Sequence, residues 1–255
     1  MILGIMPHYR ILPLGDTALT LEFGDRIDPA LQAAVSALDQ AIGDARARGH
    51  LHGIVETMPT FRSLTLIFDP LETDHDRITE LLSTLSGSSL EEPLKRRHWL
   101  LPACYEPGFA PDLDSVAHTI DGDTKTVVRL HSGCEYVVYM LGFLPGFPFM
   151  GDLPEPLHLP RRTEPRTRVP AGSVAIATGL TAIYPWESPG GWHLLGRCPV
   201  PLFDARQEAP ALLQAGDHVR FDPVSATEYE RIERALAAGE LDASAFQTSH
   251  KAGSA

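Results

Sequence analysis

The chain is poor in cysteine, and its three cysteines, Cys104, Cys134 and Cys198, form no CxxC pair. Their odd number and wide spacing argue against a zinc knuckle or a disulfide framework. Reduced thiols suit the cytoplasm, which is the compartment we expect. No apolar run approaches the ~20 residues that a membrane-spanning helix needs. The first segment, MILGIMPHYR, lacks the basic start and the cleavage site of a signal peptide, so we expect none.

Basic side chains are scarce relative to acidic ones, with 21 Lys and Arg against 33 Asp and Glu and a formal net charge of −12. Because nucleic acids and anionic membranes are bound by clustered Lys and Arg, we expect neither as a partner. A GxxxxGK[ST] phosphate-binding loop is absent, and no metal-ligand spacing stands out among the 11 His. The sequence therefore predicts no metal site and no conventional nucleotide site.

The first third of the chain mixes strand patterns with amphipathic helix patterns. We expect strands over 9–13, 17–23, 53–57, 63–68 and 95–101, and helices over 29–48 and 74–87. The Asp28-Pro29 pair is typical of a helix start, because Asp caps the helix and Pro suits its first turn. This order predicts an α+β protein whose first domain, 1–90, is small and ferredoxin-like. The strand at 95–101 either closes that domain or belongs to the next one.

The remainder reads as helices and many short strands separated by Gly or Pro. The expected helices are 111–120, 124–132 and 227–238, and the expected strands are 135–142, 173–178, 181–184, 193–197 and 218–223. Short strands at close spacing favour a β-barrel or a sandwich, here over 91–243. The small, polar residues 244–255 predict a flexible tail.

The stretch from Leu141 to Arg197 is rich in Gly and Pro yet carries many aromatic rings and four closely spaced arginines. Flexible linkers usually lack such large apolar groups, so this composition predicts short strands and shaped loops. We expect the guanidinium and indole groups to surround one cleft that faces another polypeptide.

Three motifs in and beside this stretch are distinctive. They read HSGCEYVVYMLGFLPGFPFMG, PRRTEPRTRVPAGSVAIA and IYPWESPGGWHLLGR, and an opening segment at 15–31 reads GDTALTLEFGDRIDPAL. Together they resemble the KipI (PxpB) family, the B subunits of bacterial ATP-dependent 5-oxoprolinase, also known as allophanate hydrolase subunit 1. The resemblance covers nearly the whole chain.

This resemblance implies a small α/β domain followed by a cyclophilin-like β-barrel. It also implies an enzyme that opens 5-oxo-L-proline to L-glutamate together with a PxpC (KipA-like) subunit and a PxpA (LamB/YcsF-like) subunit. The implied cofactor is ATP with Mg²⁺, bound by this chain or shared with a partner. Such chemistry needs cations for phosphate, donors for a developing oxyanion and a group that handles protons.

The chain offers candidates for each role. The candidate phosphate- or substrate-binding residues are Arg161, Arg162, Arg166, Arg168, Gly190 and Gly191. The candidate catalytic residues are His131, Tyr136, Glu187 and His193. Arginine forks suit phosphate or carboxylate, and glycines let backbone amides approach an anion closely.

Structural roles compete with these functional ones. The arginines could simply pair with Asp152, Glu164 or a partner subunit. If 166–168 is extended, Arg166 and Arg168 share one face. His131 lies in the last turn of a predicted helix, where the helix dipole favours a protonated imidazole and the ring can satisfy carbonyls. The tryptophans suit core or interface packing.

Three functional alternatives remain at this point. Some KipI relatives are described as inhibitors of a sensor histidine kinase, and exposed aromatic side chains would suit such a binding role. Prolyl isomerase activity would follow from the barrel fold alone. An allophanate-related or carboxyltransferase-type role follows from the other family label.

Overall fold

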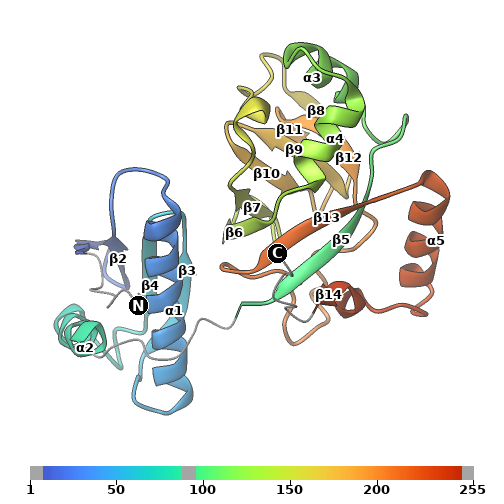
Figure 1. Cartoon of the computed structure of the whole chain (residues 1–255). Coiled ribbons are helices and arrows are strands. Elements are labelled where there is room, and N and C mark those ends of the chain that lie inside the picture. The colour runs from blue at the N-terminus through green and yellow to red at the C-terminus, as the bar shows by residue number, and fades with distance from the viewer. Residues whose placement is uncertain (1–7, 88–95, 249–255) are drawn as a thin grey trace, which may run out of the picture. The chain divides into compact units, whose positions relative to one another are not determined.

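The computed structural model describes residues 8–87 and 96–248, with the backbone alone at 84–87. The chain divides into two compact units between Lys95 and Arg96, both visible in Figure 1. The predicted boundary at residue 90 lies outside the described residues, a few positions before this division.

The first unit is a four-stranded antiparallel sheet with two helices. Its elements are β1 (Arg10–Pro13), β2 (Ala18–Glu22), α1 (Pro29–Ala47), β3 (Ile54–Pro59), β4 (Ser63–Phe68) and α2 (His75–Gly87). Gly15, at a φ of 65°, lies in the turn between β1 and β2, in a left-handed conformation that glycine adopts without strain. Asp28 caps α1 by accepting a bond from the Ala30 N–H, as the sequence predicted.

Alternating residues of the central strands form the core of this unit. Leu19 and Leu21 of β2 are fully buried together with Leu38 and Ile42 of α1. The periods of two on the strand and about 3.6 on the helix bring these side chains to one shared layer.

The element order of the first unit differs from the ferredoxin-like one we predicted. The order is β-β-α-β-β-α with strands arranged β1-β2-β4-β3, whereas a ferredoxin-like domain runs β-α-β-β-α-β. Strand β1 pairs with β2 at the edge of the sheet. In a ferredoxin-like domain, that edge position would be taken by a strand that follows the second helix. The strand expected at 95–101 corresponds to β5 (His98–Cys104) and belongs to the second unit, which is one of the two placements that the sequence left open.

The second unit is a closed barrel of seven strands. Its strands are β5 (His98–Cys104), β6 (Tyr136–Leu141), β7 (Pro148–Gly151), β9 (Ser173–Ala177), β10 (Leu180–Ile183), β12 (His193–Arg197) and β13 (His218–Val224). They follow one another as β12-β9-β10-β7-β6-β13-β5, and β5 pairs back to β12. Only the neighbours β5 and β13 are parallel among these pairs. A barrel is thus confirmed over the sandwich that the strand pattern also allowed.

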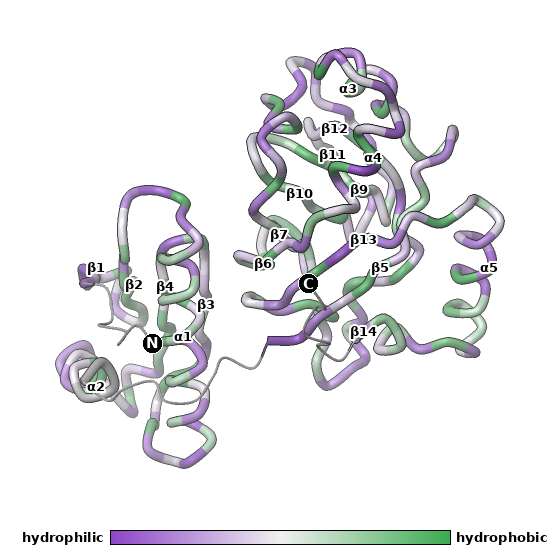
Figure 2. The backbone as a smooth tube through the Cα atoms, in the orientation of Figure 1, coloured by the Kyte–Doolittle hydropathy of each residue, from purple (hydrophilic) through white to green (hydrophobic). Residues whose placement is uncertain are grey.

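Other elements surround the barrel. They are α3 (Leu113–Thr119), α4 (Thr124–Ser132), η1 (Glu155–Leu157), the two-stranded ribbon of β8 (Arg166–Val169) and β11 (Ser188–Gly190), and α5 (Ala226–Ala237). In Figure 2, hydrophobic and hydrophilic residues alternate along α5, which buries Tyr229 and Ile232. Across the described part of the chain, no helix combines the length and apolar character that crossing a membrane requires.

The apolar side chains of the barrel strands form two clusters, one on each face of the barrel wall. The first takes residues from all seven strands, for example Tyr136 of β6 and Val219 of β13, and therefore fills the interior. The second takes the alternate residues of β9, β10 and β12, such as Ala175 and Ala182, with Phe147 and Trp192. It therefore lies on the outer surface of the barrel, where aromatic rings cover small side chains.

The flexible tail predicted from residue 244 onward is wrong for 244–248. Residues Ala243–Phe246 form η2, and β14 (Gln247–Thr248) pairs with β5. Phe246 packs against the barrel core, which offsets the cost of ordering this polar segment. Residues 249–255, the rest of the predicted tail, lie outside the described residues.

Gly196 lies at the seam where β12 meets β5, and a Cβ there would sit 2.6 Å from the backbone oxygen of Cys104. We expect Gly196→Ala to lower the free energy of unfolding of this unit by about 1–3 kcal/mol, because the strands must separate to admit the methyl group. Urea denaturation measures this. Gly43→Ala in α1 meets nothing within 4 Å and should stabilise its helix. Equal stability of Gly196→Ala and wild type would contradict the packing argument.

Candidate functional site

Asp112, just before α3, is the centre of a buried charged cluster. Its carboxylate is 4% exposed and accepts bonds from Arg162 Nη1 at 3.0 Å and Arg166 Nη2 at 2.7 Å. The second carboxylate oxygen accepts a bond from the Leu194 N–H at 2.7 Å. One acid thereby holds two arginines against strand β12. The Asp112 cluster, meaning Asp112, Arg162 and Arg166, carries a net charge of +1.

The ribbon of β8 and β11 fixes the positions of these arginines. Arg166 pairs with Gly190 across the ribbon, and the Arg162 N–H donates to the Gly191 oxygen at 2.7 Å. A side chain at Gly190 would collide with the Tyr184 hydroxyl. The predicted glycine pair therefore lies beside the cluster, where Gly190 permits a close approach of the backbone.

Arg161 and two aromatic side chains complete the surroundings. The Arg161 guanidinium lies 6.0 Å from the centre of the Trp192 ring, within the range of a cation–π contact. Burial raises the pKa of Tyr184, while the charges of Arg161 and Arg166 act in the opposite direction. Three of the four predicted arginines thus converge on the outer aromatic cluster of the barrel.

The Asp112 cluster leaves donors unsatisfied. Arg162 Nε and Arg166 Nη1 are buried and have no hydrogen-bond partner among the described residues. A buried donor without a partner costs roughly 1–3 kcal/mol, and such groups are often found where a ligand binds. A carboxylate or phosphate would supply the missing acceptors, so the arrangement suits an anion.

His193 is placed close to this region by the loop that precedes Arg161. Its Nε2 lies 2.9 Å from the Pro160 oxygen, which makes Nε2 the donor. Its Nδ1 is buried without a partner among the described residues. Two of the four predicted catalytic residues contact the arginine segment, meaning 160–168: His193 at the Pro160 oxygen and Glu187 through Arg168. His193 is the one at the end of the segment that holds Arg161 and Arg162.

His131 and Tyr136, two of the predicted catalytic residues, lie inside the barrel and are fully buried. The His131 ring bonds to the Tyr105 hydroxyl and to Thr181 Oγ1, both at 2.8 Å. The Tyr136 hydroxyl donates to the His131 backbone oxygen at 2.6 Å. Burial lowers the pKa of His131 to about 3 and raises that of Tyr136. Burial thus outweighs the helix dipole, which by itself favours a protonated imidazole, and side chains inside the barrel bond the ring in place of helix-end carbonyls.

His131 should make stability depend on pH. Its pKa falls from 6.5 to about 3 on folding, so below pH 6.5 the unfolded chain binds more protons than the folded chain. The contribution is complete above pH 6.5 and is lost as pH falls towards 3, by up to about 1.4 kcal/mol per pH unit. We expect His131→Gln to flatten this slope in urea denaturation between pH 7 and 4.5. Parallel slopes for the two proteins would refute this role.

Arg168 and Glu187 pair with each other, away from the Asp112 cluster. Their two hydrogen bonds measure 2.9 and 3.0 Å, and the side chains are 76% and 50% exposed. Arg168 shares the strand of Arg166 but binds a different acid. Neither of the alternative partners we considered for the arginines, Asp152 or Glu164, takes part in these ion pairs.

Such an exposed pair contributes little to stability. We expect Arg168→Gln to change the free energy of unfolding by less than about 1 kcal/mol, because solvent screens the charges and ordering two long side chains offsets their attraction. Thermal unfolding of the variant at low and at moderate salt checks this. A loss of several kcal/mol would show that the pair does more than the contacts indicate.

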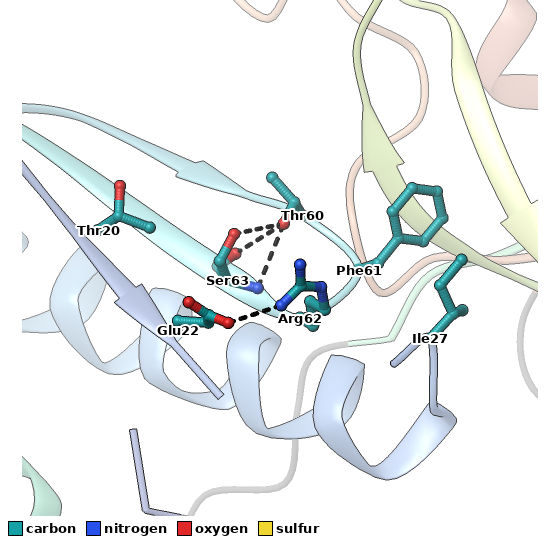
Figure 3. A pocket seen from close by; sticks show the side chains of 7 residues that line it. All are labelled: Thr20, Glu22, Ile27, Thr60, Phe61, Arg62 and Ser63. Atoms are coloured by element: carbon teal, nitrogen blue, oxygen red, sulfur yellow. Dashed lines mark hydrogen bonds and ion pairs between the residues drawn. The ribbon is translucent and has the colours of Figure 1, made fainter. Parts of the chain in front are cut away.

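A hollow of about 440 Å³ lies in the first unit, where the sequence suggested no site. Figure 3 shows its lining from β2 and from the loop between β3 and β4. Arg62 Nη1 pairs with Glu22 Oε1 at 2.8 Å and also bonds the Gly24 oxygen. Because the two charges neutralise each other, the hollow lacks the surplus positive charge of the Asp112 cluster.

Comparison with known proteins gives one consistent result. A family model described as "Carboxyltransferase domain, subdomain C and D" matches residues 9–213. The chain is 41% identical to the B subunit of 5-oxoprolinase from Escherichia coli O157:H7, over 86% of this chain and 97% of that protein. Identity to the corresponding 5-oxoprolinase protein of Bacillus subtilis (strain 168) is 36%, over 87% and 95% respectively.

A solved structure shares the architecture. The crystal structure of TTHA0988 matches with a TM-score of 0.71 and 36% identity, over 83% of this chain. The match covers 40% of the TTHA0988 chain, so TTHA0988 carries a large part that has no counterpart here.

Proposed function

The chain belongs to the carboxyltransferase-domain (subdomain C and D) family that includes the B subunits of 5-oxoprolinase, and we propose that it acts as the B-type subunit of an ATP-dependent 5-oxoprolinase. The observation that carries this proposal is the 41% identity to one such protein over 97% of that protein's length. The resemblance noted in the sequence supplies the other components, which are a PxpC-like subunit, a PxpA-like subunit and ATP with Mg²⁺.

The reaction sets the chemical demands. An unstrained lactam resists hydrolysis, and transfer of the γ-phosphoryl group to the amide oxygen activates it. Water then adds to the carbon, the ring nitrogen leaves with a proton, and a second water releases phosphate from the acyl phosphate. Substrate and intermediates carry carboxylate or phosphate charge, so fixed cations bind them and accelerate the steps in which that charge grows in the transition state.

In this proposal the Asp112 cluster binds one of those anionic groups. Asp112 holds Arg162 and Arg166 in place before the ligand arrives, which lowers the cost of organising the site. Their unsatisfied donors would point to the ligand's oxygens. His193, beside the arginine segment, would handle a proton. The nucleotide phosphates bind to the same arginines or on a partner subunit, since the chain lacks a GxxxxGK[ST] loop.

Reconstitution tests this function directly. The chain is co-expressed with PxpA-like and PxpC-like subunits, and glutamate formation from 5-oxoproline is measured with and without ATP and Mg²⁺. We expect glutamate only from the full assembly with nucleotide. An inactive full assembly, with all three subunits folded and associated, would contradict the proposal. Urea and allophanate serve as comparison substrates, and a preference for either would favour the carboxyltransferase-type alternative.

Exposed aromatic rings favour a second candidate, a regulatory binding protein. Phe143 is 66% exposed and Trp186 is 46% exposed, and the Trp186 N–H donates to the Pro145 oxygen beside Phe143. Aromatic side chains of this kind are enriched at protein interfaces. Pull-down with a histidine-kinase dimerisation domain tests this role. Binding that Trp186→Ala abolishes, in a chain whose assembly makes no glutamate, would replace the enzyme proposal.

A further inference from the structure

Two histidines and one glutamate meet at the strand starts on one edge of the barrel. His98 and His218 are the first residues of β5 and β13, and these parallel strands place the two side by side. Glu135 immediately precedes β6, which pairs with β13 on its other side. Figure 1 shows the three strands running next to one another.

The three side chains already contact one another. Glu135 Oε1 lies 3.3 Å from His98 Nδ1, and Oε2 lies 2.9 Å from His218 Nδ1. The imidazole rings lie 4.8 Å apart at an interplanar angle of 32°. The histidine side chains are 14% and 12% exposed, whereas Glu135 is 43% exposed. The site is therefore anchored by the sheet on one side and open to water on the other.

We propose that His98, Glu135 and His218 bind a divalent transition-metal ion of the Zn²⁺ class, with three protein ligands and a remaining position open to water. Two imidazole nitrogens and one carboxylate oxygen form a ligand set that zinc accepts in proteins. This site goes beyond the proposed oxoprolinase role and does not depend on it.

The distances are close to those that such an ion needs. Ligands about 2.05 Å from a tetrahedral ion lie about 3.4 Å from one another. Glu135 Oε1 lies 3.3 Å from His98 Nδ1 and the other oxygen, Oε2, lies 2.9 Å from His218 Nδ1. With one ligand atom taken from each residue, all three atoms lie within 4.8 Å of one another. Binding an ion therefore requires the imidazoles to rotate and each Nδ1, which now faces a Glu135 oxygen, to give up its hydrogen. The ligating tautomer carries its hydrogen on Nε2.

Calorimetric titration of the full chain with Zn²⁺, after treatment with a chelator, tests the proposal. We expect wild type to bind one equivalent of Zn²⁺. Glu135→Gln and His218→Ala should bind it about 100-fold more weakly or not at all. Zn²⁺ should raise the Tm of wild type but not that of Glu135→Gln. Glu135→Gln replaces a half-exposed side chain with one of the same size, so it should fold even if His218→Ala does not. His118→Ala, on the exposed face of α3, is the matched control and should bind as wild type.

Two outcomes overturn the site. One is the absence of a one-to-one event in wild type, which would leave the three side chains as a hydrogen-bonded group only. The other is equal affinity in wild type and Glu135→Gln, which would place any bound ion on other histidines or on Cys134.

Discussion

Asp112→Ala is expected to lower the free energy of unfolding of the second unit by about 3 kcal/mol, because it leaves two arginines beside the barrel without their shared acid. The carboxylate is 4% exposed and accepts bonds from Arg162, Arg166 and the Leu194 N–H. Urea denaturation followed by tryptophan fluorescence measures the loss, since Trp192 lies two residues before Leu194, whose N–H bonds Asp112.

Comparison with two other variants isolates the cause. Asp112→Asn keeps the shape but removes the charge, and it should cost less than Asp112→Ala because the amide oxygen still accepts one bond. Glu187→Gln removes the exposed acid that pairs with Arg168, and it should lower the free energy of unfolding by less than about 1 kcal/mol. The account of the cluster is wrong if Asp112→Ala and Glu187→Gln have the same small effect.

Arg166→Gln should reduce kcat/KM for 5-oxoproline in the assembled enzyme by about 100-fold or more. Preorganised donors that stabilise developing charge contribute on this scale. Arg166 lies in β8, is held by Asp112 at 2.7 Å, and retains a buried Nη1 without a partner among the described residues. Glutamate release at a series of substrate concentrations measures the loss and divides it between kcat and KM.

Arg166→Lys and Arg168→Gln complete this experiment. Lysine keeps the charge but not the planar fork, so a bidentate site should remain impaired in Arg166→Lys. Arg168 pairs with the exposed Glu187, and its variant should keep nearly full activity. If both Arg166 variants retain wild-type kcat/KM while the chain remains essential, the anion site lies elsewhere.

The sequence predicted local structure well where the physical signals were local. Helix α4 begins and ends where 124–132 was expected, because Asp123 caps it through the Thr126 N–H and Gly133 follows it. The strands β7, β8 and β11 were missed. Each is short, and Pro148 and Gly190 are residues that a strand seldom contains.

Three of the arginines and both glycines that the sequence singled out lie near one another, and their role in binding stays a prediction. Asp112 was missed because it lies 50 and 54 residues from its two arginines. It looks like a helix cap, yet its side chain makes no capping bond. The group that we propose as metal ligands gave no sequence signal for the same reason, as Glu135 lies 37 and 83 residues from its histidines. Spacing cannot reveal ligands that only strand pairing brings together.

His131 shows the opposite error. Its position in the last turn of α4 suggested a ring that satisfies helix-end carbonyls, but the turn faces the barrel interior, where Tyr105 and Thr181 bond the ring. A pattern of helix positions describes which residues share a face, and it does not tell whether that face meets water or a second layer.

The most direct measurement adds the purified chain back to its two partner subunits and follows ATP-dependent glutamate release from 5-oxoproline. The account predicts no release without the chain, full release with wild type, and almost none with a folded Arg162→Gln, Arg166→Gln double variant that still joins the assembly. Equal release with and without the chain, or full release with the double variant, would contradict it.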